Sequence, residues 1–316
     1  MFIFFATLGV TLSLSHGAAP MATSFMSLNS LAERYGIPPA KETNQYSELK
    51  CNDSILQFHR GTRRLQFDGR TFWLNAPITK YKNAWSITNE DADSTIEALL
   101  DPASILNHRG YHLVVLDPGH GGDDPGAIGY RKATEKQIVL DIATRVKRKL
   151  IASNVAVRMT RSKDQTLALS QRALLATRWG GDAFVSIHAN TAGSKTARGV
   201  ETFTLPAAGF SSTTSNKPDC TSYTGNKYNA ANTILAGFIQ HGLLANTKTP
   251  DRGVKRSRFE VLRNAPCPAA LVEVGFLSNK EEASLLLTPE YRDKVAEGIA
   301  QGILTYIVRT EVNQKH

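Results

Sequence analysis

The sequence predicts an α/β fold in which a mixed, mostly parallel sheet carries helices on both faces, preceded by a small β-rich N-terminal module. From His112 onward, short apolar runs typical of buried strands alternate with longer segments of helical periodicity. This alternation favours a sheet covered by helices. Before that point, β-forming runs flank the pair Asp68-Gly69, which is a strong hairpin signal. The length of 316 residues is sufficient for one or two such domains.

The N-terminus has the composition of a secretory signal. Residues 2–14 are almost wholly apolar, mostly small residues follow up to Ala19, and the first charged side chain is Glu33. We therefore expect residues 1–24 to be a signal peptide and the mature protein to be exported to the periplasm or cell envelope. A buried N-terminal helix is the alternative. No apolar run approaches the roughly 20 residues of a membrane helix, so we expect no integral membrane protein.

Residues 25–109 are predicted to form the small β-rich module and a linker. A short helix is expected at 31–35, where Ser30 and Glu33 have the spacing of a capping box. Strands are predicted at 54–59, 64–67, 71–74 and around 85–87. The polar residues from Asn89 onward predict a linker up to about residue 109.

Residues 110–312 are predicted to form the main α/β domain. Strands are expected at 112–116, 155–159, 183–187, 200–205, 259–262 and 270–274. Helices are expected from Thr134 to about Leu150 and at 170–179, 229–244 and 291–308. Thr134 and Gln137 have the spacing of a capping box at the start of the first helix. The apolar positions that share one face of this helix are Val139, Ala143, Val146 and Leu150.

The net charge of +9 favours a polyanionic partner such as nucleic acid, anionic lipid or an anionic wall polymer. The densest basic runs, Arg145–Lys149 and Arg60–Arg70, are equally consistent with solvated surface. Export and the dispersed charge argue against nucleic acid. The three cysteines lack CxxC spacing and allow at most one disulfide, so we expect no zinc-binding or catalytic role for them.

Candidate catalytic side chains stand at the ends of predicted elements. His120 lies on a glycine-rich turn after the first strand, Glu135 in the first turn of the next helix, and His188 after the strand 183–187. Two histidines and one glutamate are a typical ligand set of catalytic zinc, because three protein ligands leave the fourth coordination position of the metal open for water. Taken singly, each has another reading: a loop residue, a carboxylate at a helix dipole, or a hydrogen-bonded core histidine.

Glu273 places a carboxylate inside an otherwise apolar strand. A buried carboxylate is costly unless it is paired, protonated or functional. An ion pair with a lysine or arginine is one reading. Beside a metal, the same carboxylate would be suited to deprotonate water and pass the proton on.

Five segments resemble the zinc-dependent N-acetylmuramoyl-L-alanine amidases of the type 3 family, in the family's order and over about residues 111–308. The segments are LDPGHGGDDPGAIG, TEKQIVLDIA, SQRALLATRWGGDAFVSIHAN, GVETF and LVEVGFLSN. The resemblance implies that His120, Glu135 and His188 bind one Zn²⁺ and that Glu273 is the catalytic acid/base. Arg172 matches the arginine of the family's Ser-Leu-x-x-Arg element, without an assigned role.

The same resemblance implies hydrolysis of the amide between the lactyl group of N-acetylmuramic acid and L-alanine, in wall remodelling and daughter-cell separation. We expect a monomer whose partner is peptidoglycan. An activator protein at the division site would be a second partner. The N-terminal module resembles small domains found ahead of some wall amidases. Some members carry an autoinhibitory helix after the GVETF strand, but Pro206–Lys227 is rich in Ser, Thr and Gly without helical periodicity.

Two alternatives remain open at the level of the sequence. A wall-binding protein could use this domain as a scaffold, although such proteins usually lose a ligand or the catalytic carboxylate, and all four residues are present here. A zinc hydrolase could also cut a peptide bond elsewhere in the stem, which the spacing of the motifs does not exclude.

Overall fold

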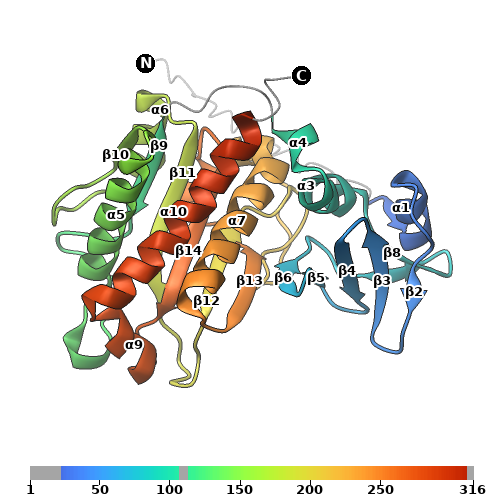
Figure 1. Cartoon of the computed structure of the whole chain (residues 1–316), viewed down its shortest axis with the longest axis horizontal. Coiled ribbons are helices and arrows are strands. Elements are labelled where there is room, and N and C mark those ends of the chain that lie inside the picture. The colour runs from blue at the N-terminus through green and yellow to red at the C-terminus, as the bar shows by residue number, and fades with distance from the viewer. Residues whose placement is uncertain (1–22, 107–112, 312–316) are drawn as a thin grey trace, which may run out of the picture.

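One continuous mixed sheet of eleven strands runs through the described residues, 23–106 and 113–311, of the computed structural model (Figure 1). In spatial order it contains β10 (Val157–Met159), β9 (Val114–Pro118), β11 (Ala183–Asn190), β14 (Ala269–Phe276), β12 (Val200–Thr204), β13 (Asp251–Arg256), β6 (Arg70–Trp73), β5 (Arg64–Phe67), β4 (Ser54–His59), β3 (Tyr46–Cys51) and β2 (Lys41–Glu42). The predicted α/β class is confirmed. The predicted signal peptide lies almost wholly outside the described residues.

The strand directions place several strand ends at one edge of the sheet. β10, β9, β11 and β14 are mutually parallel. β12 runs antiparallel to β14 and parallel to β13. β12 and β13 therefore begin at the edge where β9, β11 and β14 end, and side chains from all five strands can meet there.

Three long helices cover one face of the sheet, as Figure 1 shows: α5 (Glu135–Ala152), α7 (Asn229–Thr247) and α10 (Pro289–Glu311). The four apolar positions predicted on one face of α5 are all buried. At the α7–α10 contact, a Cβ at Gly242 would lie 2.1 Å from the carbonyl oxygen of Gly298, so glycine permits the close approach of the two backbones. None of the helices within the described ranges has the length and apolar composition needed to cross a membrane.

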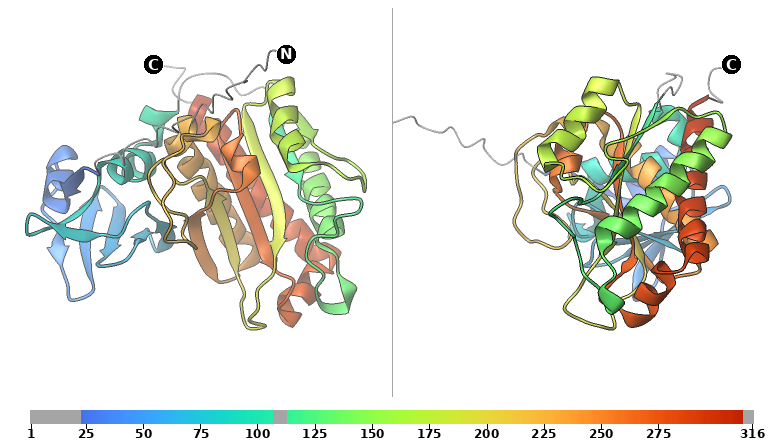
Figure 2. Two further views of the ribbon diagram at one scale, coloured as in Figure 1. Left: turned by 180° about the vertical axis from the view of Figure 1, so that it is seen from behind. Right: turned by 90° about the vertical axis from the view of Figure 1, so that its left-hand side faces the viewer.

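The opposite face is covered over only part of its area. α6 (Leu169–Trp179) and α8 (Glu260–Arg263) pack on it near the edge where β11 and β14 begin, around Phe184 and Leu271. Towards the other edge, Figure 2 (left) shows the described strands of this face without a covering helix. The uncovered part is the part that carries His188 and Glu273, which lie side by side on β11 and β14.

The N-terminal module joins the main sheet through backbone pairing. β6 runs parallel to β13, with Phe72 opposite Val254, and the predicted hairpin turn forms with positive φ at Asp68 and Gly69. A second sheet contains β1 (Phe25–Ser27), β8 (Ala84–Thr88) and β7 (Thr79–Tyr81). The structure also has a helix, α1 (Leu28–Arg34), which begins before the predicted start because Ser27 rather than Ser30 caps it.

Residues 89–105, which we predicted to be a polar linker, are helical. The segment contains α2 (Asn89–Asp91), η1 (Ala92–Ile96), α3 (Glu97–Leu100) and α4 (Pro102–Ile105). Thr88 caps its start by accepting a hydrogen bond from the Asp91 amide at 3.1 Å. Ala92 and Ile96 are fully buried. The linker prediction was wrong because apolar contacts with the rest of the fold outweigh the polar character of the segment.

Two further predictions in the main domain were wrong, and the elements β13 and α9 (Lys280–Leu286) were not predicted. The predicted strand at 259–262 is the short helix α8, and the strand neighbouring β12 is β13. Thr134 is the N-cap of α5, but its side chain makes no capping hydrogen bond, so the capping box is absent.

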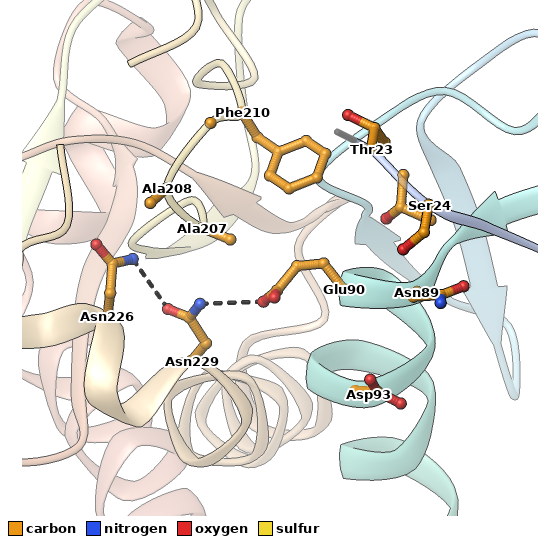
Figure 3. A pocket seen from close by; sticks show the side chains of 12 residues that line it. Thr23, Ser24, Asn89, Glu90, Asp93, Ala207, Ala208, Phe210, Asn226 and Asn229 are labelled. Atoms are coloured by element: carbon orange, nitrogen blue, oxygen red, sulfur yellow. Dashed lines mark hydrogen bonds between the residues drawn. The ribbon is translucent and has the colours of Figure 1, made fainter. Parts of the chain in front are cut away.

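The segment after β12 contains no α-helix over residues 206–223, as the loop prediction required. It ends in the 3-10 helix η3 (Thr224–Tyr228), which was not predicted. Between this segment and α2 lies a hollow of about 380 Å³ (Figure 3). Asn229 donates a hydrogen bond to Glu90 across it at 3.1 Å. The hollow lies next to the end of β12, because residues just after this strand line it. Since β12 runs antiparallel to β14, the hollow is at the edge of the sheet opposite to the ends of β9, β11 and β14.

Candidate metal centre

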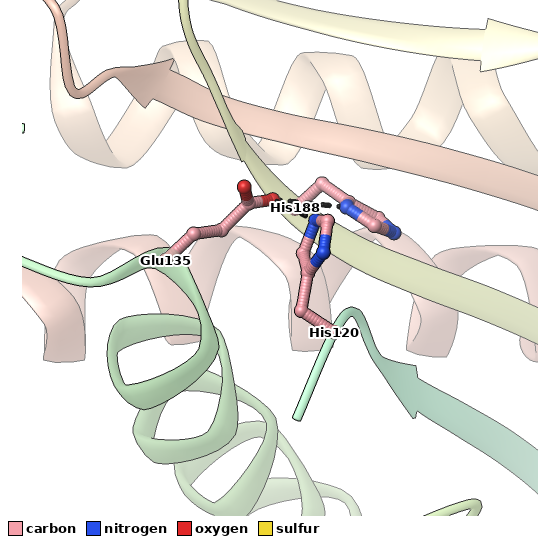
Figure 4. A group of neighbouring side chains, drawn as sticks. All are labelled: His120, Glu135 and His188. Atoms are coloured by element: carbon pink, nitrogen blue, oxygen red, sulfur yellow. Dashed lines mark hydrogen bonds and ion pairs between the residues drawn. The ribbon is translucent and has the colours of Figure 1, made fainter. Parts of the chain in front are cut away.

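His120, Glu135 and His188 converge at the edge where β9 and β11 end (Figure 4). One potential ligand atom from each residue lies within 4.8 Å of the others. Oε1 of Glu135 is 2.9 Å from Nδ1 of His188 and 3.1 Å from Nε2 of His120. The three residues come from the turn after β9, the first turn of α5 and the end of β11, as the sequence predicted.

Neighbouring groups fix the orientation of these side chains. The amides of Ala127 and Ala189 donate to the two carboxylate oxygens of Glu135 at 2.8 and 3.0 Å. Nδ1 of His120 lies 2.7 Å from Oδ2 of Asp124, which leaves Nε2 to face the cluster. Burial raises the pKa of Glu135, but the hydrogen bonds from His120 and His188 outweigh it and hold this pKa well below its usual value. The carboxylate is therefore anionic.

Glycines leave the space that the cluster occupies. A Cβ at Gly119 would lie 2.2 Å from Cε1 of His188, and a Cβ at Gly126 would lie 2.6 Å from Oε2 of Glu135. His120 itself has a φ of +58°, which is uncommon for a residue with a side chain. The glycine-rich run of the sequence thus serves the packing of the ligand-type side chains.

Two buried arginines hold the turn that carries His120. Arg172 donates to Oδ1 of Asp117 at 2.9 Å and to the carbonyl oxygens of Pro118 and His120 at 2.8 Å each. Arg161 donates to the carbonyl oxygens of Pro118 and Gly119 at 2.9 and 2.7 Å. Both guanidinium groups thus fix the backbone beside the metal centre. From the sequence, Arg172 had no assigned role and Arg161 was not recognised as a functional residue.

We expect Arg161→Met to destabilise the fold by about 3 kcal/mol, because buried carbonyl oxygens lose their hydrogen-bond donor. Displacement of the His120 turn should weaken metal binding in the same variant. Denaturant unfolding and a zinc titration measure the two effects. Arg178→Met, which changes an exposed arginine of α6, is the matched control. Equal stability of the two variants would contradict the role given to Arg161.

Glu273 stands next to the metal centre. It is the register partner of His188 on β11 and of Glu201 on β12. Its Oε2 is buried and has no hydrogen-bond partner among the described residues. Burial raises the pKa of the Glu273 carboxyl well above its usual value, and the nearby Glu135 and Glu201 carboxylates raise it further. Among the described residues, no lysine or arginine forms an ion pair with Glu273, so the alternative reading of its sequence does not hold; Glu201 forms such pairs with Arg252 and Lys255 instead.

The other residues singled out in the sequence do not form a second site. Arg60 contacts Glu42 and Ser47, whereas Arg63 points inward and donates to the carbonyl oxygens of Ser211 and Ser212. The run 60–70 is therefore not one basic patch. The three cysteines are unpaired, and burial raises the pKa of Cys267 to about 12, which makes this thiol unreactive.

Comparison with known proteins points to one family. The family described as N-acetylmuramoyl-L-alanine amidase matches residues 114–305. The amidase LytC of Bacillus subtilis is 39% identical over 194 residues, which are 61% of this chain and 35% of LytC. The amidase AmiA of Escherichia coli is 34% identical over 221 residues, covering 62% of this chain and 76% of AmiA.

Solved structures agree with this assignment. The catalytic domain of the amidase CwlV from Bacillus (Paenibacillus) polymyxa is 34% identical, with a TM-score of 0.54 over 62% of this chain and 98% of that domain. The CwlD amidase of Clostridioides difficile, solved in complex with the GerS lipoprotein, is 29% identical, with a TM-score of 0.53 over 62% of this chain and 98% of CwlD.

Proposed function

The chain belongs to the N-acetylmuramoyl-L-alanine amidase family, and from this membership we propose that it is an exported zinc hydrolase of peptidoglycan. The bond cleaved joins the lactyl group of N-acetylmuramic acid to L-alanine. The observation that carries the zinc proposal is the convergence of His120, Glu135 and His188, whose ligand-type atoms lie within 4.8 Å of one another.

The donor set fits zinc. Two imidazole nitrogens and one carboxylate are a ligand combination of catalytic zinc sites, and three protein ligands leave a position open. Metal-binding histidines usually form a hydrogen bond to a carboxylate or carbonyl oxygen through the ring nitrogen that does not bind the metal. Nδ1 of His120 forms such a hydrogen bond with the carboxylate of Asp124. When bound here, zinc would act as a Lewis acid on the scissile carbonyl and lower the pKa of water to about 7.

Glu273 is the residue that we propose to move the proton. It lies beside His188 on the neighbouring strand, and no group among the described residues donates a hydrogen bond to its Oε2, so this oxygen has no competing partner as a proton acceptor. The same carboxyl then donates that proton to the L-alanine nitrogen as this nitrogen leaves. The raised pKa of Glu273 suits the second step, because it favours the protonated carboxyl that delivers the proton to the leaving nitrogen.

Digestion of purified sacculi tests the proposed function. We expect the mature protein to release free stem peptides that begin with L-alanine, identified by mass spectrometry. A chelator should abolish the release, and zinc should restore it. Peptides cut elsewhere would indicate a different bond, and binding to sacculi without any release would indicate a wall-binding scaffold.

The cellular setting is also a proposal. We propose that residues 1–24 direct export, that 25–109 form an accessory module and 110–312 the catalytic domain, and that the protein acts as a monomer in the periplasm or cell envelope. An activator protein at the division site would regulate it. The complex of the related CwlD with a lipoprotein supports the idea of a protein partner.

A further inference from the structure

A charge imbalance lies on the uncovered face of the sheet, one strand beyond Glu273. Glu201 of β12 is 3% exposed. Its Oε2 accepts from Nε of Arg252 at 2.7 Å and from Nζ of Lys255 at 2.5 Å. Its Oε1 accepts from the side-chain amide of Asn190 at 2.7 Å. Two cations therefore share one carboxylate, and one positive charge is left over.

The unneutralised positive charge is accessible to solvent on the guanidinium of Arg252. Only Nε of this guanidinium contacts Glu201; its two terminal nitrogens have no hydrogen-bond partner among the described residues. The guanidinium lies over the ring of Phe276, 4.7 Å from the centroid, which fixes its plane. The indole of Trp73 donates to the carbonyl oxygen of Arg252 at 3.3 Å. The side chain is 34% exposed, so a ligand can reach it.

Arg252 and the metal centre share one edge of the sheet. Arg252 is at the start of β13, and this start lies at the edge where β11 and β14 end. His188, Glu273 and Glu201 form a row across β11, β14 and β12, with β13 next. Three strand spacings correspond to about 14 Å. An extended peptide spans about 3.5 Å per residue, so four residues cover this distance.

We propose that Arg252 binds a free carboxylate of the stem peptide whose first residue lies at the metal centre. An arginine with two free terminal N–H groups can bind a carboxylate in bidentate fashion, and Lys255 adds to the local positive potential. The stem peptide would cross β14 and β12 along the row from Glu273 to Arg252. This proposal rests on the proposed function, because it assumes that the substrate is a wall peptide.

Binding of synthetic stem tetrapeptides tests the proposal without turnover. The probe is L-Ala-γ-D-Glu-L-Lys-D-Ala, together with two forms in which either the D-Glu α-carboxylate or the C-terminal carboxylate is a carboxamide. Calorimetry measures their affinities for the zinc-loaded Glu273→Gln protein, with and without Arg252→Gln. The peptide in which the carboxylate bound by Arg252 is replaced by a carboxamide should bind about 10- to 100-fold more weakly than the free acid, as expected for the loss of a charged bidentate pair. The other carboxamide should bind like the free acid.

The double-mutant comparison separates recognition from general damage. In the Arg252→Gln background, the weakly binding carboxamide should bind as well as the free acid, because the partner of the carboxylate is already gone. Arg252→Lys should retain part of the discrimination. If both carboxamides bind the Arg252 protein as tightly as the free acid, or if Arg252→Gln weakens all three peptides equally, Arg252 only neutralises Glu201 and the proposal is wrong.

Arg148→Gln is the matched control, since Arg148 is an exposed arginine of α5, a helix on the other face of the sheet. It should leave all three affinities unchanged. Sacculus digestion by the unmodified protein tests the proposed function separately. A protein that releases L-alanine peptides but shows no carboxylate discrimination refutes only the Arg252 assignment. A protein that releases none and also binds no zinc refutes the proposed function itself.

Discussion

Glu273→Gln is expected to reduce the release of stem peptides from sacculi by about 10²- to 10⁴-fold while leaving zinc bound. Glutamine preserves the shape of the side chain but cannot take a proton from water or deliver one to the leaving nitrogen. Glu273 is not part of the His120–Glu135–His188 cluster, so the substitution removes no ligand. Initial rates on purified sacculi and the zinc content of the purified variant measure the two effects.

The stability of the same variant provides a further control. Oε2 of Glu273 is buried, and no described residue forms a hydrogen bond with it. Removing a buried ionisable group that lacks a partner should not lower stability. We expect the melting temperature of Glu273→Gln to equal or exceed that of the unmodified protein. A variant that folds, binds zinc and digests sacculi at the unmodified rate would exclude Glu273 as the proton carrier.

His188→Ala is expected to abolish both metal binding and peptide release. It removes one of the three proposed ligands, and the loss in zinc affinity should exceed the roughly 10- to 100-fold typical of outer contacts. Nδ1 of His188 is also a partner of Glu135, so the buried Glu135 carboxylate loses a contact as well. Zinc titration with a competing chelator measures affinity, and added zinc at high concentration tests for recovery of activity.

His241→Ala is the matched control for this experiment, because His241 is an exposed histidine of α7 outside the cluster. Its zinc content and activity should equal those of the unmodified protein. Full zinc content together with full activity in His188→Ala would mean that the metal lies elsewhere. Full zinc content with lost activity would assign His188 to the reaction rather than to metal binding.

The convergence of His120, Glu135 and His188 could be predicted from the sequence, because strand and helix ends are the places where parallel strands bring side chains together. The glycines around His120 and the carboxylate of Glu273 inside an apolar strand are local features of the sequence. They can be recognised without any knowledge of tertiary contacts. The α5 face was predictable for the same reason, since a single buried stripe repeats with the helical period.

The parts that the sequence did not reveal depend on distant contacts. β13 has the sequence DRGVKR, in which Gly253 has a φ of +86° and the register with β12 shifts, so strict alternation is absent. Residues 89–105 form helices because they pack on the rest of the fold. Arg161 contacts carbonyl groups more than 40 positions away in the chain, and no local pattern indicates such a role.

The pairing of β6 with β13 has a consequence for preparing the proposed catalytic domain alone. A domain cut before residue 110 would leave the far side of β13 as an open strand, with backbone N–H and C=O groups that no longer have the β6 hairpin beside them. Such edges recruit strands from other molecules and promote self-association. The β5–β6 hairpin therefore covers a strand edge that would otherwise promote aggregation. We expect a protein truncated before residue 110 to lose solubility at high concentration before it loses any other property.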